Sequence, residues 1–296
     1  MTKRIPDFFI IGAPKAGTTA MSEYLRRHPD ILFSEPKEPY FFNDDFSSRY
    51  AKSYEDYLKC FSGGTGGGRL WGEGSVFYLF SQAAVSNILN CRPDAKFIVM
   101  LRNPIDAAYS MHWQALFSTD EDILDFEEAW RAQVDRQKGV RVPRHNKIRE
   151  ALMYGPLFKY GEQLTRLYNH VARERIHIVL FEDFVSDPGR CYADTLDFLG
   201  LRFCELPTFG QVNRSKRYRS RWLMSVLREG VKIKKRLGVT RELGIMTRVK
   251  AWNTKHERRP PLSKKIREEL RRYFDADIRK TEKLIGRDLS AWRKDR

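Results

Sequence analysis

Long apolar runs are missing from this 296-residue chain, and cysteines are few. No stretch reaches the roughly 18 consecutive apolar residues that a membrane-spanning helix needs. The basic and then apolar N-terminal stretch is too short for the core of a signal peptide and runs directly into a turn. The four cysteines form no Cys-x-x-Cys pair and no cluster with histidine, which argues against a metal site. We therefore expect a cytoplasmic protein that has reduced, mostly buried thiols and needs no metal.

Acidic residues are scarce toward the C-terminal end. Residues 211–296 contain 28 Lys or Arg and 10 Asp or Glu, a net charge of +18, whereas the first 210 residues contain 26 and 28, a net charge of −2. A strongly basic region favours anionic partners such as nucleotides, acidic glycans, nucleic acids or membrane surfaces. A solvated basic surface that serves only solubility is the alternative interpretation.

Strand-like and helix-like segments alternate along the chain, whose 42% hydrophobic and 13% aromatic residues are typical of a globular protein. Apolar runs predict buried strands at 8–11, 96–101 and 176–181. Helices are predicted over 16–27, 54–61, 82–89, from 104 past 113, and over 157–172, 192–199 and 263–285. No linker or internal repeat is visible, so we expect one α/β domain over residues 1–296. Its P-loop-type central parallel β-sheet should have helices on both faces and bind ligands at the carboxyl ends of its strands.

Two further segments can each be interpreted in two ways. The charged segment 116–149 is either an insertion near the acceptor site or a surface excursion. The helix-like segment 221–237 has apolar residues roughly on one face and basic residues largely elsewhere. We interpret it as a helix that packs on the core, the alternative being a surface for an acidic glycan or an anionic bilayer.

The most informative motif is FFIIGAPKAGTT at 8–19, in which an apolar strand, a glycine-containing turn and a helix start follow one another. This order is typical of a phosphate-binding loop, where backbone N–H groups and the helix dipole face an anion. Gly12 and Gly17 have the spacing of a Walker A loop, but Thr18, followed by Thr19, stands where the Walker lysine is expected. The only cation of the turn is Lys15. We therefore assign anion binding to the loop residues Lys15, Ala16, Gly17, Thr18 and Thr19.

A second motif, LRNPIDAAYS at 101–110, follows the predicted strand 96–101. P-loop ATPases often place a magnesium-binding aspartate at the end of such a strand, whereas this strand ends at Arg102. A guanidinium is suited to bidentate hydrogen bonding with phosphate. Ser110 lies about two helical turns further on, where it can contact the same phosphate. An arginine that only pairs with a carboxylate is the alternative.

A third motif, EPKEPYFF at 35–42, contains Glu38 in a proline-flanked segment that continues into three aromatic residues. Packing of these aromatic side chains beside the loop would desolvate the carboxylate and suit it to act as a general base. A glutamate that is merely exposed at the surface is the alternative.

Together these motifs resemble the PAPS-dependent sulfotransferase family, in particular its carbohydrate (heparan-type) branch and bacterial relatives; PAPS is 3′-phosphoadenosine-5′-phosphosulfate. PKAGTT resembles the family's 5′-phosphosulfate loop, LRNPIDAAYS its 3′-phosphate motif and KEPYFF the segment with the catalytic glutamate, and similarity extends over nearly the whole chain. The resemblance implies that PAPS is the co-substrate, that PAP is the product, and that Arg102 and Ser110 bind the 3′-phosphate. It implies that Glu38 and Lys15 are catalytic. It also implies a basic loop over the 3′-phosphate, for which the candidates are Lys255, Arg258 and Arg259.

One departure from the family is informative. Heparan-type enzymes have Glu-Lys-Ser/Thr where this chain has Glu73, Gly74 and Ser75, so Gly74 replaces a lysine that is involved in catalysis there. The replacement leaves Lys15 as the main cation at the leaving group and makes Glu73 a second candidate for acceptor contact. His112, shortly after the 3′-phosphate motif, is a candidate for the acceptor pocket, with core packing as the alternative.

We therefore predict a sulfotransferase that moves a sulfuryl group from PAPS to a hydroxyl or amine of an acceptor. The family branch favours a carbohydrate or glycoconjugate, and no nucleic acid is expected as a partner. One alternative is a P-loop kinase or NTPase, because the apolar strand at 176–181 is followed by Glu182 and Asp183, as in a Walker B element. Another is a non-enzymatic protein that binds polyanions through the basic C-terminal region. At this stage either Glu38 or Glu73 is the candidate base.

Overall fold

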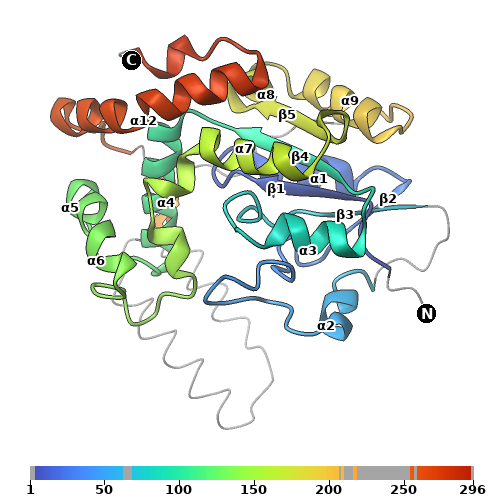
Figure 1. The fold of residues 1–296 in the computed structure, drawn as a ribbon, viewed down its shortest axis with the longest axis horizontal. Helices are drawn as coiled ribbons and strands as arrows, with labels where there is room; N and C mark the ends of the chain where they lie inside the picture. Colours follow the sequence, from blue (N-terminus) through green and yellow to red (C-terminus); the bar gives the residue numbers. More distant parts are fainter. Residues whose placement is uncertain are drawn as a thin grey trace, which may run out of the picture.

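The computed structural model describes residues 4–62, 69–206, 208–209, 216–218, 254–256 and 259–294. Its centre is a five-stranded parallel β-sheet with the strand order β2-β3-β1-β4-β5 (Figure 1). The predicted parallel sheet of an α/β fold is therefore confirmed. The strands are β1 (Phe8–Gly12), β2 (Ile31–Phe33), β3 (Leu70–Glu73), β4 (Lys96–Leu101) and β5 (Ile176–Leu180). The strand that carries the glycine-containing loop is thus the middle one.

Helices cover both faces of the sheet because successive side chains of a buried strand point to opposite sides. Phe8 and Ile10 of β1 belong to a core on one face, with side chains of α1, α8 and α9. Phe9 and Ile11 belong to the core on the other face, with side chains of α3, α4, α7 and α12. These helices are α1 (Thr18–Arg26), α3 (Ala84–Cys91), α4 (Pro104–Ser118), α7 (Tyr160–His170), α8 (Phe181–Ser186), α9 (Pro188–Leu199) and α12 (Lys264–Ile285).

The start of α7 depends on its neighbour α12, beside which it lies (Figure 1). No side chain of its own caps α7. Instead, Asp277 of α12 accepts hydrogen bonds from the backbone N–H groups of Gly161 and Glu162, at 2.9 and 3.1 Å. A tertiary contact therefore supplies the cap, and α7 begins at Tyr160 rather than at the predicted residue 157.

The other α-helices and strands of the described residues lie around this core. They are α2 (Tyr54–Lys59), α5 (Phe126–Arg131), α6 (Gln133–Gln137) and an antiparallel pair of short strands, β6 (Lys216–Tyr218) and β7 (Thr254–His256). The helix predicted at 221–237 lies outside the described residues. Within the part of the chain that the structure describes, no helix combines the length and the apolar composition needed to cross a membrane.

A buried ion pair holds the segment between α4 and α7 in place. Arg136 Nη2 lies 2.7 Å from Glu121 Oε1, and both side chains are fully buried. The Glu121 carboxylate also accepts a hydrogen bond from the Tyr154 hydroxyl at 2.8 Å. Burial acts to raise the pKa of Glu121, but the hydrogen bond and the charge of Arg136 outweigh it, so that this pKa is lowered. The ion pair and the Tyr154 hydrogen bond therefore tie together three parts of this segment, which are 15 and 33 residues from Glu121.

We expect Arg136→Met to reduce the free energy of unfolding by about 3–5 kcal/mol, because it leaves the Glu121 carboxylate buried without its partner. Urea unfolding followed by tryptophan fluorescence measures the effect. The matched control is Arg131→Met, which removes only exposed ion pairs with Glu127 and Glu269 and should change stability little. Equal stability of the two variants would show that the buried pair does not hold this segment.

Candidate active site

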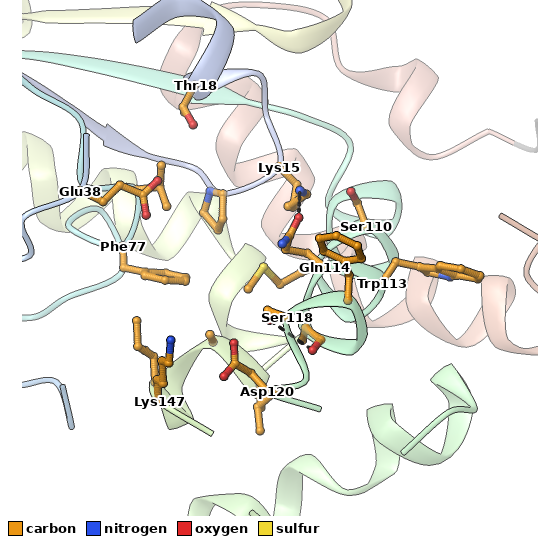
Figure 2. A pocket seen from close by; sticks show the side chains of 18 of the residues that line it. Lys15, Thr18, Glu38, Phe77, Ser110, Trp113, Gln114, Ser118, Asp120 and Lys147 are labelled. Carbon is orange, nitrogen blue, oxygen red and sulfur yellow. Dashed lines mark hydrogen bonds between the residues drawn. The ribbon is translucent and has the colours of Figure 1, made fainter. Parts of the chain in front are cut away.

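A cavity of about 520 Å³ opens where β1 and β4 end. It lies between the loop after β1, the segment around Glu38, helix α4 and the chain around Lys147 (Figure 2). This edge of the sheet is the one at which ligands of parallel α/β sheets bind. The predicted site residues in its wall are Lys15, Thr18, Thr19, Glu38, Ser110 and Arg259.

The loop between β1 and α1 leaves the N-terminus of α1 open toward the cavity. Gly17 precedes the helix with a left-handed φ of 90°, and no side chain caps the first turn. Only glycine suits this position, because a Cβ would lie 3.0 Å from Cδ1 of Phe184 in addition to the unfavourable φ. Lys15 is also left-handed, with φ of 66°. The N–H groups of the first helical turn are therefore not covered by a capping side chain, as an anion-binding helix start requires.

The Lys15 ammonium lies among other cations. Its Nζ donates a hydrogen bond to Gln114 Oε1 at 3.3 Å. Burial, followed by the positive charges of Arg259 and Arg102, lowers the pKa of Lys15 to about 8, while the charge of Glu38 acts in the opposite direction. Positive charge gathered in a partly buried place is unfavourable unless an anion compensates it. This end of the cavity is therefore suited to a ligand with phosphate groups.

Arg102 supports the loop from behind, at the end of β4. Its Nη1 donates a hydrogen bond to the Lys15 carbonyl oxygen at 3.1 Å, and its guanidinium lies 4.4 Å from the centre of the Phe181 ring. Ser110 Oγ and Arg259 Nε are buried, and neither has a hydrogen-bond partner among the described residues. Buried polar atoms of this kind are normally paired, so their position beside Lys15 indicates oxygen atoms of a ligand.

Two of the predicted phosphate-binding residues are not placed by the structure. Arg258 lies outside the described residues. Lys255 belongs to β7, but its side chain is not described. Their assignment to the basic loop stays a prediction, whereas Arg259 is in the cavity wall.

The Glu38 carboxylate is held on both oxygens by its neighbours in sequence. Oε1 accepts a hydrogen bond from Lys37 Nζ at 2.9 Å, and Oε2 accepts one from the Tyr40 hydroxyl. In Figure 2, Glu38 and Ser110 lie on opposite sides of the cavity with Lys15 between them. Our sequence analysis missed Lys37 and Tyr40, although both flank Glu38 in KEPYFF. A carboxylate with fixed oxygens at a cavity wall has the geometry of a general base.

Glu73, at the end of β3, does not reach the cavity wall. Its carboxylate is fully buried and accepts hydrogen bonds from the hydroxyls of Tyr57 at 2.6 Å and Ser75 at 2.5 Å. Burial raises the pKa of Glu73 to about 7. The Ser75 hydroxyl oxygen accepts a hydrogen bond from the Tyr40 N–H at 3.1 Å, so Glu73 anchors the backbone beside Glu38. This position corrects the predicted contact of Glu73 with the acceptor.

His112 is part of the core rather than of the acceptor pocket, which is a second correction. Its Nε2 lies 2.9 Å from the Ile123 carbonyl oxygen, and its ring packs edge-on against Tyr154. Helix geometry explains this placement, because residues two apart on a helix point in directions about 200° apart. His112 therefore faces away from Ser110. Gln114, four residues after Ser110, shares its face of α4 and lines the cavity.

The far end of the cavity combines aromatic and polar side chains. Phe77 lies between Glu38 and Lys147, and Asp120 and Lys147 lie toward the opposite end from Thr18, whereas Trp113 lies beside Ser110 (Figure 2). Asp120 Oδ1 is buried without a hydrogen-bond partner in the described parts of the chain. The segment 116–149 therefore contributes to the cavity wall, which favours its interpretation as an insertion near the site. No spacing in the sequence linked Asp120 or Lys147 to the loop.

Glu182 and Asp183, directly after β5, interact with side chains of the C-terminal segment. Glu182 Oε1 accepts a hydrogen bond from Trp292 Nε1 at 3.1 Å, and Asp183 Oδ2 lies 2.9 Å from Arg287 Nη2. Neither carboxylate is in the cavity wall, and β4 separates β5 from β1. Among the described residues, no group of three or more His, Cys, Asp or Glu side chains is arranged to hold a metal ion. The observation that favoured a kinase or NTPase is thus explained by contacts with the C-terminal segment.

A family model for the sulfotransferase domain matches residues 5–289, almost the entire chain. The chain belongs to the sulfotransferase domain family. Its fold is similar to that of a sulfotransferase from Alicyclobacillus acidocaldarius, with a TM-score of 0.73 and 28% identity over 98% of this chain and 100% of that one. The predicted family is therefore confirmed.

Curated relatives include members of the heparan-type branch. The mouse heparan sulfate glucosamine 3-O-sulfotransferase 3B1 is 30% identical over 201 residues, which cover 68% of this chain and 47% of that protein. The membrane-associated sulfotransferase kil1 of Dictyostelium discoideum is 24% identical over 278 residues, which cover 69% of this chain and 58% of that protein. This member of the family thus spans about half the length of the curated relatives it matches.

Proposed function

We propose that this chain transfers a sulfuryl group from PAPS to a hydroxyl or amine of an acceptor. The observation that carries the proposal is the pair of buried, unpartnered donors, Ser110 Oγ and Arg259 Nε, near Arg102 and beside the phosphate loop. A second phosphate-binding group next to a phosphate loop fits a nucleotide with phosphates on both its 5′ and 3′ positions. PAPS has this feature and ATP lacks it.

Each of these residues has a separate role in the proposed reaction. Glu38 accepts the proton of the acceptor while the acceptor oxygen or nitrogen forms a bond to sulfur. The bond between sulfur and the bridging oxygen of the 5′-phosphate breaks, and its electron pair leaves with PAP. Lys15 and the N–H groups at the start of α1 stabilise the charge that builds up on this oxygen. Arg102, Ser110 and Arg259 hold the 3′-phosphate.

We further propose a carbohydrate or glycoconjugate as the acceptor. The relatives named as heparan sulfate sulfotransferases support this class. The acceptor end of the cavity supports it as well, because Phe77 offers an aromatic surface and Asp120 offers an unpaired buried carboxylate oxygen for a hydroxyl group. A cytoplasmic location is also proposed, since the four cysteines are unpaired, as expected in a reducing compartment.

Thermal unfolding with added nucleotides tests the proposed co-substrate. PAP without Mg²⁺ is expected to raise the midpoint, because a ligand that binds only the folded state stabilises it. Stabilisation by Mg-ATP alone would instead favour the kinase alternative. Salt-sensitive polyanion binding without a PAP effect would favour the non-enzymatic alternative. Incubation with ³⁵S-labelled PAPS and fractionated glycans then identifies the acceptor.

The variant Arg102→Ala is expected to weaken PAP binding roughly 10–100-fold, because charged hydrogen bonds to the 3′-phosphate and the support of the Lys15 carbonyl are both lost. Isothermal titration calorimetry measures the dissociation constant. Arg279→Ala, which removes only an exposed ion pair on α12, serves as the control and should bind PAP like the wild type. An unchanged PAP affinity for Arg102→Ala would exclude Arg102 from the nucleotide site.

A further inference from the structure

Lys37 joins the phosphate loop to the candidate base, and neither the family pattern nor the sequence motifs assigned it a role. Its ammonium donates hydrogen bonds to Thr18 Oγ1 at 3.1 Å and to Glu38 Oε1 at 2.9 Å. Only 12% of the side chain is exposed. Thr18 is the first residue of α1, and both Thr18 and Glu38 line the cavity. The ammonium therefore lies between the anion-binding helix start and the base.

The space for Lys37 exists because residue 74 is glycine. The Gly74 N–H donates a hydrogen bond to the Lys37 carbonyl oxygen at 3.1 Å, so the two backbones are neighbours. A Cβ on residue 74 would lie 3.0 Å from Cε and 3.1 Å from Cγ of Lys37, closer than ordinary contacts allow. The same Cβ would lie 3.1 Å from Ser22 Oγ, so a side chain at residue 74 would compete for space with Lys37 and would also press on Ser22.

We propose that Lys37 is the positioning residue of the sulfuryl-transfer site, and that it occupies the space which a lysine at position 74 would otherwise fill. Its ammonium fixes the Glu38 carboxylate relative to the start of α1, while the Tyr40 hydroxyl holds the other carboxylate oxygen. This inference rests on the proposed function and extends it to Lys37, which lies next to Gly74, the position that departs from the heparan-type pattern.

Both contacts of Lys37 serve orientation. The hydrogen bond to Thr18 fixes the ammonium against the start of a helix, which is a rigid support. The hydrogen bond to Glu38 then fixes the carboxylate, although Glu38 itself belongs to no helix or strand. Orientation of a base within a fraction of an ångström strongly affects the rate of proton transfer and of attack, because the reacting atoms must meet in one geometry. Loss of Lys37 should therefore reduce turnover more than nucleotide affinity.

Kinetics of Lys37→Met, with the acceptor found by the ³⁵S screen, test the inference. We expect kcat to fall about 100-fold, since misplacement of a reacting group by about 1 Å has an effect of this size. The PAP dissociation constant should stay within about threefold and Lys37→Arg should recover part of the loss. Lys59→Met removes an exposed lysine paired with Asp56 and should keep the wild-type kcat.

A double-mutant cycle separates this role from a general effect on folding. Gly74→Ala should lower kcat in the wild-type background, because the added methyl group displaces Lys37. It should have a smaller effect in the Lys37→Ala background, where only the close approach to Ser22 Oγ remains. The exchange variant Lys37→Ala/Gly74→Lys should recover more activity than Lys37→Ala alone. PAP-induced thermal shifts show that each variant is folded.

Two results would overturn the inference, and they can be told apart. A wild-type kcat in folded Lys37→Met, or strictly additive effects in the cycle, would remove Lys37 from the reaction while leaving the proposed function intact. Absence of sulfuryl transfer and of PAP binding by the wild-type protein would overturn the proposed function, and this inference with it.

Discussion

Replacing Glu38 by glutamine is expected to lower kcat about 10²–10⁴-fold, the usual contribution of a general base. The amide has the shape of the carboxylate but cannot accept the proton of the acceptor. Ser110 belongs to the proposed 3′-phosphate site, and Glu38 lies across the cavity from it. PAP should therefore bind to the variant within about threefold of the wild-type affinity. Steady-state kinetics with ³⁵S-labelled PAPS, combined with calorimetric titration of PAP, measure both quantities on the same preparation.

The matched control for this variant is Glu35→Gln in the same segment. Glu35 forms an exposed ion pair with Arg26 on the outside of α1 and lies outside the cavity wall. We expect its kcat and its PAP affinity to equal those of the wild type. If Glu38→Gln keeps the wild-type kcat, Glu38 is not the base. If it loses PAP binding to the same extent as kcat, Glu38 contributes to nucleotide binding instead of proton transfer.

Replacing Lys15 by methionine is expected to lower kcat about 10²–10³-fold, the effect of removing one donor that stabilises the charge developing in the transition state. PAP affinity should fall as well, since the ammonium faces the same phosphate in the product complex. Lys283→Met on the exposed side of α12 removes one positive charge far from the loop in sequence and serves as the control. A normal kcat for Lys15→Met would show that another cation stabilises the leaving group.

The lowered pKa of Lys15 adds a pH signature to this prediction. Burial and the charges of Arg259 and Arg102 lower this pKa to about 8, so Lys15 loses its proton above pH 8 in the free protein. Bound phosphate favours the protonated form, and PAP affinity should therefore be greatest below pH 8. Above pH 8 it should fall by up to about tenfold per pH unit, because binding then takes up a proton.

Titrations of PAP between pH 7 and pH 9.5 measure this dependence. Lys15→Arg keeps its charge over the whole range and should show a flatter profile. Lys15→Met should bind weakly at every pH. A wild-type affinity that stays constant up to pH 9.5 would contradict the assignment of Lys15 to the phosphate site.

Local patterns were enough to predict the parts of the site that belong to one strand, turn or helix. The order strand, glycine-containing turn and helix start is encoded within 8–19, and the structure shows it as β1, an uncapped loop and α1. The end of β4, directly before Arg102, follows from the apolar run of the strand. Helix periodicity also predicts which neighbour of Ser110 lines the cavity: Gln114, four residues later, shares its face of the helix, whereas His112 does not.

The sequence by itself thus determined the α/β class, the phosphate loop and the candidates Lys15, Arg102, Ser110 and Glu38, since each follows from a pattern of residues that are near neighbours along the chain. Only the tertiary structure decided which distant segments share the cavity. It placed Asp120 and Lys147 in its wall and Glu73 behind it. It also brought Lys37 over Gly74, because the space that one backbone leaves for another depends on strand pairing and packing, which no spacing in the sequence encodes.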